Sequence, residues 1–286
     1  MADGIGGADL PPHRAGDGQL SRRRVPERLR GLVDSHCHLQ HERFDADREA
    51  VIERARASGI ERIMVPGWDL ASSEAALELA ARHGPLIDAA VGVHPHDAAT
   101  MDEARWARLE ALAADARTVA IGEIGLDYFR NLSPPAVQRE AFARQLGLAA
   151  ARDLPVLVHD RDAHADVTDA LLGWAGRLKR PTRGVLHAFS GDQPMAMQLA
   201  DAGFLISFAL PVAFRSAARA RAAAGALPAA SLLVETDAPY LGPDAERRNE
   251  PTTALRVAAE LARLRGTSAA AIALDARAAY ERLVRP

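Results

Sequence analysis

The chain has 286 residues, of which 48% are hydrophobic, and its formal net charge is −3. This length suits one large α/β domain. The near-neutral charge argues against a protein that reads long duplex DNA, but it does not exclude an enzyme that binds a strand end. The single cysteine, Cys37, excludes an internal disulfide and a thiolate-rich zinc site, and it favours a reducing compartment, so we expect a cytoplasmic protein.

The first thirty residues are rich in Gly, Asp, Arg and Pro and show no periodicity. We therefore predict a disordered extension over residues 1–30 and a single domain over residues 31–286. The run Ser21–Arg24 resembles a twin-arginine export signal, but a polar segment, Val25–Arg28, follows it where an apolar one is required. No apolar stretch approaches the ~20 residues of a membrane span, so we expect no membrane association.

Eight apolar runs, separated by segments with helical periodicity, predict alternating strands and helices. The predicted strands are 32–38, 61–66, 86–93, 117–123, 155–159, 183–188, 203–208 and 231–236, and the clearest helices are 71–82, 103–115, 136–152 and 252–265. Such alternation indicates a parallel sheet with helices outside, and eight repeats favour a closed (β/α)₈ TIM barrel. A Rossmann-like sheet is the alternative, but His36-Cys37-His38 follows the first strand in place of a glycine-rich loop.

His36 and His38 lie two residues apart at the end of the first predicted strand, after Asp34. Residues i and i+2 of a strand point to the same side, so both imidazoles face the barrel interior if one does. A His-x-His pair alone is a weak signal of a metal site. Its position at a strand end strengthens it.

Four further candidate ligands end later strands: Glu123 the fourth, His159 the fifth, His187 the sixth and Asp237 the eighth. Neighbouring strands lie about 5 Å apart, so His159 and His187 can share one ion, although they could also be hydrogen-bonded core histidines. The eighth strand of a closed barrel adjoins the first, which brings Asp237 towards the histidine pair. A buried carboxylate there is costly without a partner such as a metal ion.

This pattern predicts two divalent ions bridged by one carboxylate. The only lysine, Lys179, ends a helical stretch, so a carbamylated lysine cannot be the bridge, and Glu123 is the acidic side chain placed for it. The predicted ligands of the first ion are His36, His38, Glu123 and Asp237, and those of the second are Glu123, His159 and His187. Mixed nitrogen and oxygen ligands favour Zn²⁺, Mn²⁺, Ni²⁺ or Co²⁺ over an all-oxygen Mg²⁺ site, without fixing the native metal. Two such ions activate water and stabilise an oxyanion, with Glu123 holding both ions and Asp237 as general base.

Substrate contacts are predicted around the same mouth. His94 ends the third strand and is placed for phosphate or the attacking water, or else it only orders the turn at Pro95. Arg161 follows His159 by two positions and can bind phosphate bidentately, unless it is merely solvated. Tyr128 and Arg130 lie in a loop over the mouth, where an aromatic ring beside a cation suits a terminal base and its phosphate, although Tyr128 could simply pack the loop.

These segments resemble the TatD family of metal-dependent deoxyribonucleases, within the amidohydrolase-like barrels, from about residue 33 to the C-terminus. The matching segments include Asp34–Leu39, Gly92–His96, Ala120–Tyr128, His187–Gly191, Glu235–Leu241 and Asn249–Pro251. The resemblance implies hydrolysis of DNA phosphodiesters as a 3′→5′ exonuclease, commonly supported by Mg²⁺ or Mn²⁺. The chain departs from the family pattern at Asp160 and Ala188, in a short loop before Asn249, and in its first thirty residues.

The favoured hypothesis is therefore a metal-dependent hydrolase that cleaves single-stranded or 3′-ended DNA, with no obligate protein partner. The same ions could hydrolyse another ester or amide, and a D-aminoacyl-tRNA deacylase belongs to that alternative. A non-catalytic protein-quality factor is a third possibility. The retention of all six ligand residues argues against it, because clustered imidazoles and carboxylates have no structural benefit in an empty barrel mouth.

Overall fold

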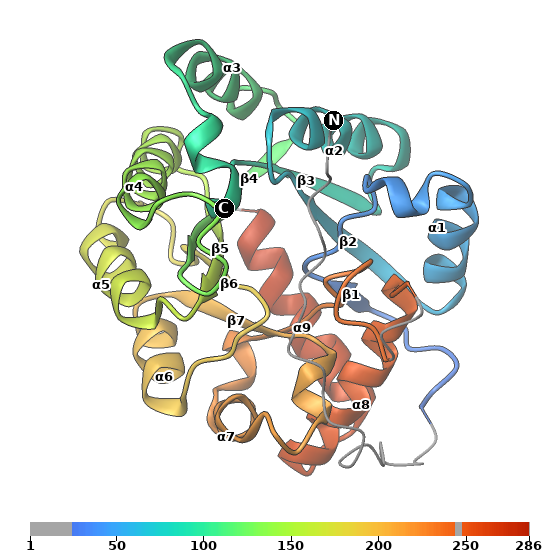
Figure 1. Cartoon of the computed structure of the whole chain (residues 1–286). Helices are drawn as coiled ribbons and strands as arrows, with labels where there is room; N and C mark the ends of the chain where they lie inside the picture. Colours follow the sequence, from blue (N-terminus) through green and yellow to red (C-terminus); the bar gives the residue numbers. More distant parts are fainter. Residues whose placement is uncertain (1–24, 244–247, 286) are drawn as a thin grey trace.

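The chain forms an eight-stranded parallel barrel surrounded by helices, as predicted (Figure 1). The structure is a computed structural model that describes residues 25–243 and 248–285. Neighbouring strands pair in parallel in chain order from β1 to β8. The strands are β1 Leu32–Asp34, β2 Ile60–Pro66, β3 Ile87–Val91, β4 Thr118–Asp127, β5 Val156–Arg161, β6 Gly184–Leu186, β7 Phe204–Phe208 and β8 Leu232–Val234.

Backbone contacts just beyond β1 and β8 close the ring. The Ser35 N–H donates to the Val234 carbonyl at 2.9 Å, and the His38 N–H donates to the Ala238 carbonyl at 2.7 Å. Cys37 and Ala238 form a parallel bridge between these segments. The predicted neighbourhood of the first and eighth strands is therefore present, and it brings the chain after β8 beside the two histidines after β1.

Nine α-helices lie in the described part of the chain and enclose the sheet. They are α1 Arg48–Ala57, α2 Leu70–His83, α3 Glu103–Ala113, α4 Pro135–Arg152, α5 His164–Ala175, α6 Gln193–Asp201, α7 Ala218–Ala226, α8 Ala254–Arg265 and α9 Ala269–Val284. The four helices predicted from periodicity match α2, α3, α4 and α8. Local capping fixes several starts: Asp69 and Ser72 form a capping box at α2, and Asp102 and Asp192 accept backbone N–H groups at α3 and α6. No helix of the described ranges is both long and apolar enough to cross a membrane.

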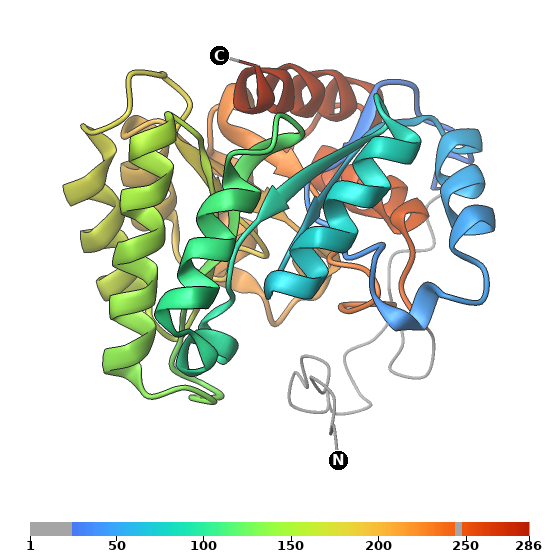
Figure 2. The same ribbon diagram turned by 90° about the horizontal axis from the view of Figure 1, so that it is seen from above.

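Short 3₁₀ turns, Glu42–Phe44, Pro95–Thr100, Leu210–Ala213, Ala229–Ser231 and Pro251–Thr253, complete the described elements. The last helix, α9, is distinct from the outer ring, because it lies across one end of the barrel (Figure 2). Its Tyr280 is fully buried and donates a hydrogen bond from its hydroxyl to Asp88 Oδ2, at the start of β3. The N-terminal end of the barrel is thus covered, and the C-terminal end is left for the loops.

Two strands, β4 and β5, continue past the ends expected from sequence, and four strands, β1, β3, β6 and β8, stop two to four residues earlier. Regular pairing of β1 ends at Asp34, so His36 and His38 follow the strand. β4 and β5 remain paired as far as Asp127 and Arg161, so Glu123 and His159 lie inside strands and not at their ends. The register between β4 and β5 is irregular between Ile121 and Ile124, and beyond this point the two strands pair for several more residues.

The predicted disordered extension is described only in part. Residues 1–24 lie outside the described residues. Within the remainder, Leu29 is buried, and its N–H donates to the Ser58 carbonyl at 2.8 Å. The packed chain therefore includes residues just before the predicted boundary at 31.

Candidate metal centre

Six side chains that are far apart in the sequence converge at the C-terminal mouth of the barrel. They are His36, His38, Glu123, His159, His187 and Asp237. All are buried except His159, whose side chain is 16% exposed. Since they come from β1, β4, β5, β6 and β8 or the residues just after them, the barrel curvature is what aims them at one point.

One oxygen of Glu123 completes the first group of ligand atoms. His36 Nε2 lies 3.2 Å from His38 Nε2 and 3.2 Å from Glu123 Oε2. Asp237 Oδ1 lies 3.7 Å from His36 Nε2 and 3.5 Å from His38 Nε2, and the distance from His38 Nε2 to Glu123 Oε2 is 3.5 Å. Four potential ligand atoms from four residues therefore face a common centre.

These spacings fit a metal ion. Four ligand atoms at bond lengths of about 2.1 Å around a tetrahedral ion lie about 3.4 Å from one another. The five distances above range from 3.2 to 3.7 Å. A neutral imidazole has only one N–H, so protons alone cannot satisfy two imidazoles and two carboxylates that all face one another. The donor set and its spacing thus suit a divalent cation.

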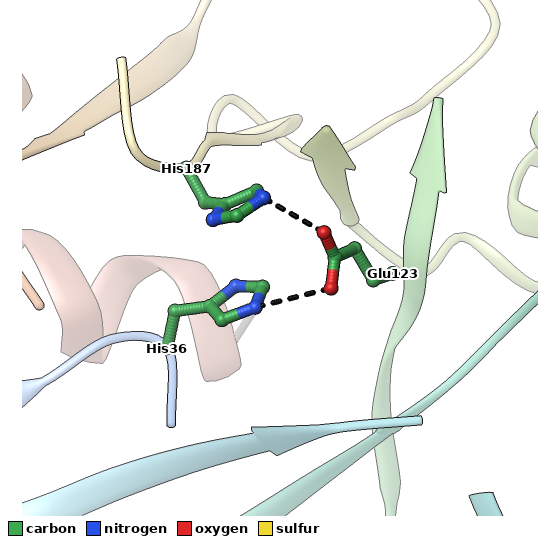
Figure 3. Close-up of side chains that lie close together, drawn as sticks. All are labelled: His36, Glu123 and His187. Carbon is green, nitrogen blue, oxygen red and sulfur yellow. Dashed lines mark ion pairs between the residues drawn. The ribbon is translucent and has the colours of Figure 1, made fainter. Parts of the chain in front are cut away.

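The other oxygen of Glu123 faces a second group of imidazoles. Glu123 Oε1 lies 2.8 Å from His187 Nε2 and 3.1 Å from His159 Nδ1, and these two nitrogens are 3.2 Å apart. Figure 3 shows Glu123 between His36 and His187, with a different oxygen towards each ring. The two oxygens of Glu123 therefore face two different groups of imidazole nitrogens.

The histidines keep Glu123 ionised. Burial raises the pKa of its carboxyl, but His187, His36 and His94 lower it by more, so its pKa lies well below the usual range. Burial likewise opposes the charge on His187, yet Glu123 raises the pKa of that imidazole well above its usual value. The site therefore holds a carboxylate anion ready for cations on both sides.

Asp127 is a site residue for which the sequence analysis assigned no role. Its Oδ2 accepts hydrogen bonds from His159 Nε2 at 3.3 Å and from His96 Nε2 at 2.8 Å. Its Oδ1 accepts backbone N–H groups of Phe129 and Arg130. These bonds outweigh burial and hold the pKa of Asp127 below its usual range. A carboxylate behind a ligating imidazole fixes the ring orientation and raises its basicity. The sequence signal that could have identified Asp127 is its spacing, because it follows Glu123 by four residues along the same strand.

Glu235 has a similar position behind His187. Its side chain is fully buried, and Oε1 lies 3.6 Å from His187 Nδ1 while accepting the Ala188 N–H at 2.6 Å. Asp34 is the other buried acid nearby, and it accepts both the hydroxyl and the N–H of Thr236. Burial raises the pKa of Asp34 well above its usual value despite these bonds. Asp34 thus joins the end of β1 to the Glu-Thr-Asp segment that carries Asp237.

Asp237 is held by its backbone. Its N–H donates to the His36 carbonyl at 2.8 Å, its carbonyl accepts the Tyr240 N–H, and its φ of 56° lies in the left-handed region. A non-glycine residue in this region is costly and persists where the surrounding structure fixes it, most often at functional sites. The carboxylate is consequently aimed at the ligand cluster and remains 7% exposed.

A cavity of about 80 Å³ lies over the cluster and receives most of the predicted substrate residues. Its lining consists of His38, Trp68, His94, His96, Asp97, Glu123, Asp127, Arg130, His159, Arg161, His187, Asp237 and Tyr240. We call it the metal-site cavity. Trp68 and Tyr240 were not predicted to line the site. Their rings contact His38 edge-on, at centroid distances of 5.3 and 5.9 Å.

His94 lies next to the ligand cluster itself. Its Nε2 lies 3.5 Å from Glu123 Oε1, and His94, Glu123 and His159 each offer an atom within 4.8 Å of the others. Its Nδ1 accepts the His96 N–H at 3.2 Å, which orders the turn at Pro95. The two roles considered for His94, at the turn and at the site, are therefore compatible.

The structure brings Arg161 and Arg130 to the cavity but turns Tyr128 away. The Tyr128 hydroxyl donates to Asp166 on α5 and accepts from Arg139 on α4, so this ring is not among the lining residues. The aromatic ring next to a cation is instead Phe129, whose centroid lies 4.0 Å from Arg161 Cζ. The Tyr128 ring thus lies outside the lining of the metal-site cavity, held by hydrogen bonds to the outer helices, and its contact with substrate stays a prediction.

Comparisons with known proteins show what this chain is similar to. A model of the family described as TatD related DNase matches residues 33–285. The chain is 39% identical over 236 residues to YabD of Bacillus subtilis, named an uncharacterized metal-dependent hydrolase, and the match covers 82% of this chain and 91% of that protein. It is 40% identical over 242 residues to the protein named 3′-5′ ssDNA/RNA exonuclease TatD of Cronobacter sakazakii, covering 82% and 90%. The crystal structure of YjjV, a TatD homolog from Escherichia coli, superposes with a TM-score of 0.83 and 31% identity, covering 92% of this chain and all of that one.

Proposed function

Because this chain belongs to the TatD related DNase family and is a metal-dependent hydrolase, we propose that it removes nucleotides from the 3′ ends of single-stranded DNA with two divalent ions. The name of its Cronobacter relative, a 3′-5′ ssDNA/RNA exonuclease, supports this substrate and makes RNA a second one to test. The observation that carries the proposal is the bridging position of Glu123, with Oε2 at 3.2 Å from His36 and Oε1 at 2.8 Å from His187.

The proposed ligands follow from the two atom groups. His36 Nε2, His38 Nε2, Glu123 Oε2 and Asp237 Oδ1 would hold the first ion. Glu123 Oε1, His159 Nδ1 and His187 Nε2 would hold the second, with His94 Nε2 next to it. Mg²⁺, Mn²⁺, Zn²⁺, Ni²⁺ and Co²⁺ are the candidates, and the imidazole nitrogens favour the transition metals among them.

When bound, the ions supply charge that activates water and stabilises the anion formed at phosphorus during in-line displacement. Residues of the chain accept the proton of the water and orient the ligands. Asp237 takes the proton of the attacking water, since its carboxylate lines the metal-site cavity and its backbone is fixed to His36. Asp127 keeps His159 oriented, and Glu235 lies behind His187 in the same way.

Arg161 and Arg130 are the proposed phosphate contacts. Both line the metal-site cavity, and a guanidinium recognises a phosphate through two parallel hydrogen bonds. Replacing Arg161 by Ala should raise KM for single-stranded DNA about tenfold and change kcat less. The matched control is Arg56→Ala on α1, which removes an exposed arginine paired with Glu53 and should leave both constants unchanged.

The decisive experiment compares substrates on one metal-free preparation. The purified protein is stripped with chelator, reloaded with each candidate ion in turn, and given 5′-labelled single-stranded DNA, the matching RNA and a D-aminoacyl-tRNA. The proposal requires metal-dependent shortening of the DNA from its 3′ end with release of mononucleotides. Hydrolysis of the aminoacyl ester without any attack on DNA or RNA would replace it with the rival deacylase activity.

A further inference from the structure

A second and larger cavity, of about 470 Å³, opens beside the metal centre. We call it the side cavity. It shares His159, Arg161, His187 and Asp237 with the lining of the metal-site cavity, so the two cavities adjoin at the ligand cluster. The metal-site cavity, at about 80 Å³, suits a phosphate group, whereas the side cavity is in the size range of sites for small organic ligands.

The far wall of the side cavity is apolar. Phe189 and Phe208 meet there edge to face, with ring centroids 6.0 Å apart, and Pro211, Val212 and Leu241 extend the surface. These residues come from β7 and from the loops after β6, β7 and β8. Apolar and aromatic walls of this kind bind the faces of nucleobases without selecting a hydrogen-bond pattern.

Two arginines, Arg161 and Arg219, line the side cavity together with two carboxylates, Asp160 and Asp237. Arg161 lines both cavities. Arg219, on α7, lines the side cavity but not the metal-site cavity. Arg219 has no hydrogen-bond or ion-pair partner among residues 25–243 and 248–285. Asp160 pairs with His164, whose Nδ1 lies 2.8 Å from Asp160 Oδ2, and Asp237 belongs to the first group of ligand atoms. An apolar wall with cationic edges is complementary to a base joined to phosphates.

We propose that the side cavity binds the base and sugar of the terminal nucleotide while its 5′ phosphate lies at the metal centre. The inference rests on the proposed nuclease function and adds to it a binding site for the nucleoside that the reaction releases. The contacts are aromatic and aliphatic surfaces with few polar groups, so the site accepts all four bases. The released 5′-mononucleotide is consequently a competitive inhibitor, and its affinity comes from the base as well as the phosphate.

The test uses Ala218→Trp, which fills the cavity from the first residue of α7. Ala218 lines the side cavity, and it is exposed and distant in the chain from every proposed ligand, so the indole blocks space without removing a contact at the metals. Ala222→Trp is the matched control, because Ala222 is exposed one turn later on the same helix and lies outside the lining.

Calorimetric titration of the Mn²⁺-loaded protein compares thymidine 5′-monophosphate with 2-deoxyribose 5-phosphate, which lacks the base. The wild type and Ala222→Trp should bind the nucleotide about tenfold or more tightly than the sugar phosphate, the scale of one stacked base. Ala218→Trp should bind both alike, and its KM for single-stranded DNA should rise by a similar factor.

The outcomes separate this inference from the proposed function. If the wild type shortens DNA but binds the two phosphates equally, or if Ala218→Trp keeps the preference, the side-cavity inference is overturned and the nuclease stands. If the wild type attacks neither DNA nor RNA and binds no mononucleotide, both are overturned.

Discussion

The two ends of the barrel both contain buried charges, and they satisfy them in different ways. At the N-terminal end, Arg62 grips Asp88 through Nε and Nη2, at 2.9 and 2.6 Å, and the Tyr280 hydroxyl donates to the same carboxylate. At the C-terminal mouth, His36 and Glu123 belong to a group of nitrogens and oxygens that face one another without enough protons to join them. The first arrangement is complete within the protein, whereas the second is complementary to a cation. The buried polar groups at the mouth therefore point to a bound cation, whereas those at the N-terminal end point to a role in stability.

The largest effects are expected at the mouth. Asp237→Asn and Glu123→Ala should each lower kcat on single-stranded DNA by roughly 10²-fold or more, the scale of losing a general base, because Asp237 accepts the water proton and Glu123 joins the two ion sites. Circular dichroism and bound-metal analysis of each variant accompany the assay. Wild-type turnover by a folded, metal-loaded Asp237→Asn protein would remove the role assigned to this carboxylate.

At the opposite end, the same kind of change should damage stability and not catalysis. Asp88→Ala leaves the Arg62 guanidinium without its carboxylate and the Tyr280 hydroxyl without its acceptor, so we expect a loss of about 3 kcal/mol in the free energy of unfolding. Urea denaturation measures it. Asp88→Asn keeps an acceptor for Tyr280 and should lose less. A fall in kcat for folded Asp88→Ala would contradict the separation of the two ends.

Metal binding should stabilise the protein through the mouth alone. With free Mn²⁺ at a hundredfold excess over the dissociation constant of a site, each bound ion should raise the free energy of unfolding by about 2.7 kcal/mol relative to chelated protein. His36→Ala should lose most of the contribution of the first ion, since it removes a nitrogen from the first ligand group, and should keep that of the second. Asp88→Asn, whose change lies at the other end, should show the full gain. Thermal melts with and without chelator give the comparison.

A smaller effect concerns Asp97, an acid in the metal-site cavity with no described side-chain partner. Burial, aided by Asp69, raises its pKa to about 6 from 3.8. The folded state then binds more protons than the unfolded state between these values, so this group lowers stability as pH rises from about 4 to 6. For a partly exposed carboxyl the cost is about 1 kcal/mol after allowance for solvent screening.

Metal-depleted Asp97→Asn should accordingly be more stable than the wild type by that amount at pH 8 and nearly equal to it at pH 4. Paired urea denaturations at the two values measure the difference. A constant difference across this range would show that Asp97 is not the titrating group.

The sequence alone determined the barrel and the identity of the clustered side chains. The direction of side chains along a strand is a local property, because alternate residues face opposite sides. The C-terminal ends of parallel strands meet at one mouth of the barrel. His36 and His38 lie on either side of the Cys37–Ala238 bridge, so they share a face although regular pairing of β1 ends at Asp34. The order of the strands then brings His159, His187 and Asp237 to the same mouth, whatever the details of the loops.

The tertiary structure decided which atoms meet. The split of Glu123 between two groups depends on rings from the residues just after β1 and β6, and the position of Asp127 depends on β4–β5 pairing that runs beyond the predicted strand ends. The direction of the Tyr128 side chain could not be predicted for a related reason, since its hydroxyl bonds to Asp166, 38 residues away. The backbone of a strand, and of the residues just after it, sets the direction of the ligand side chains. The direction of Tyr128 is set by a partner that only the folded chain brings near.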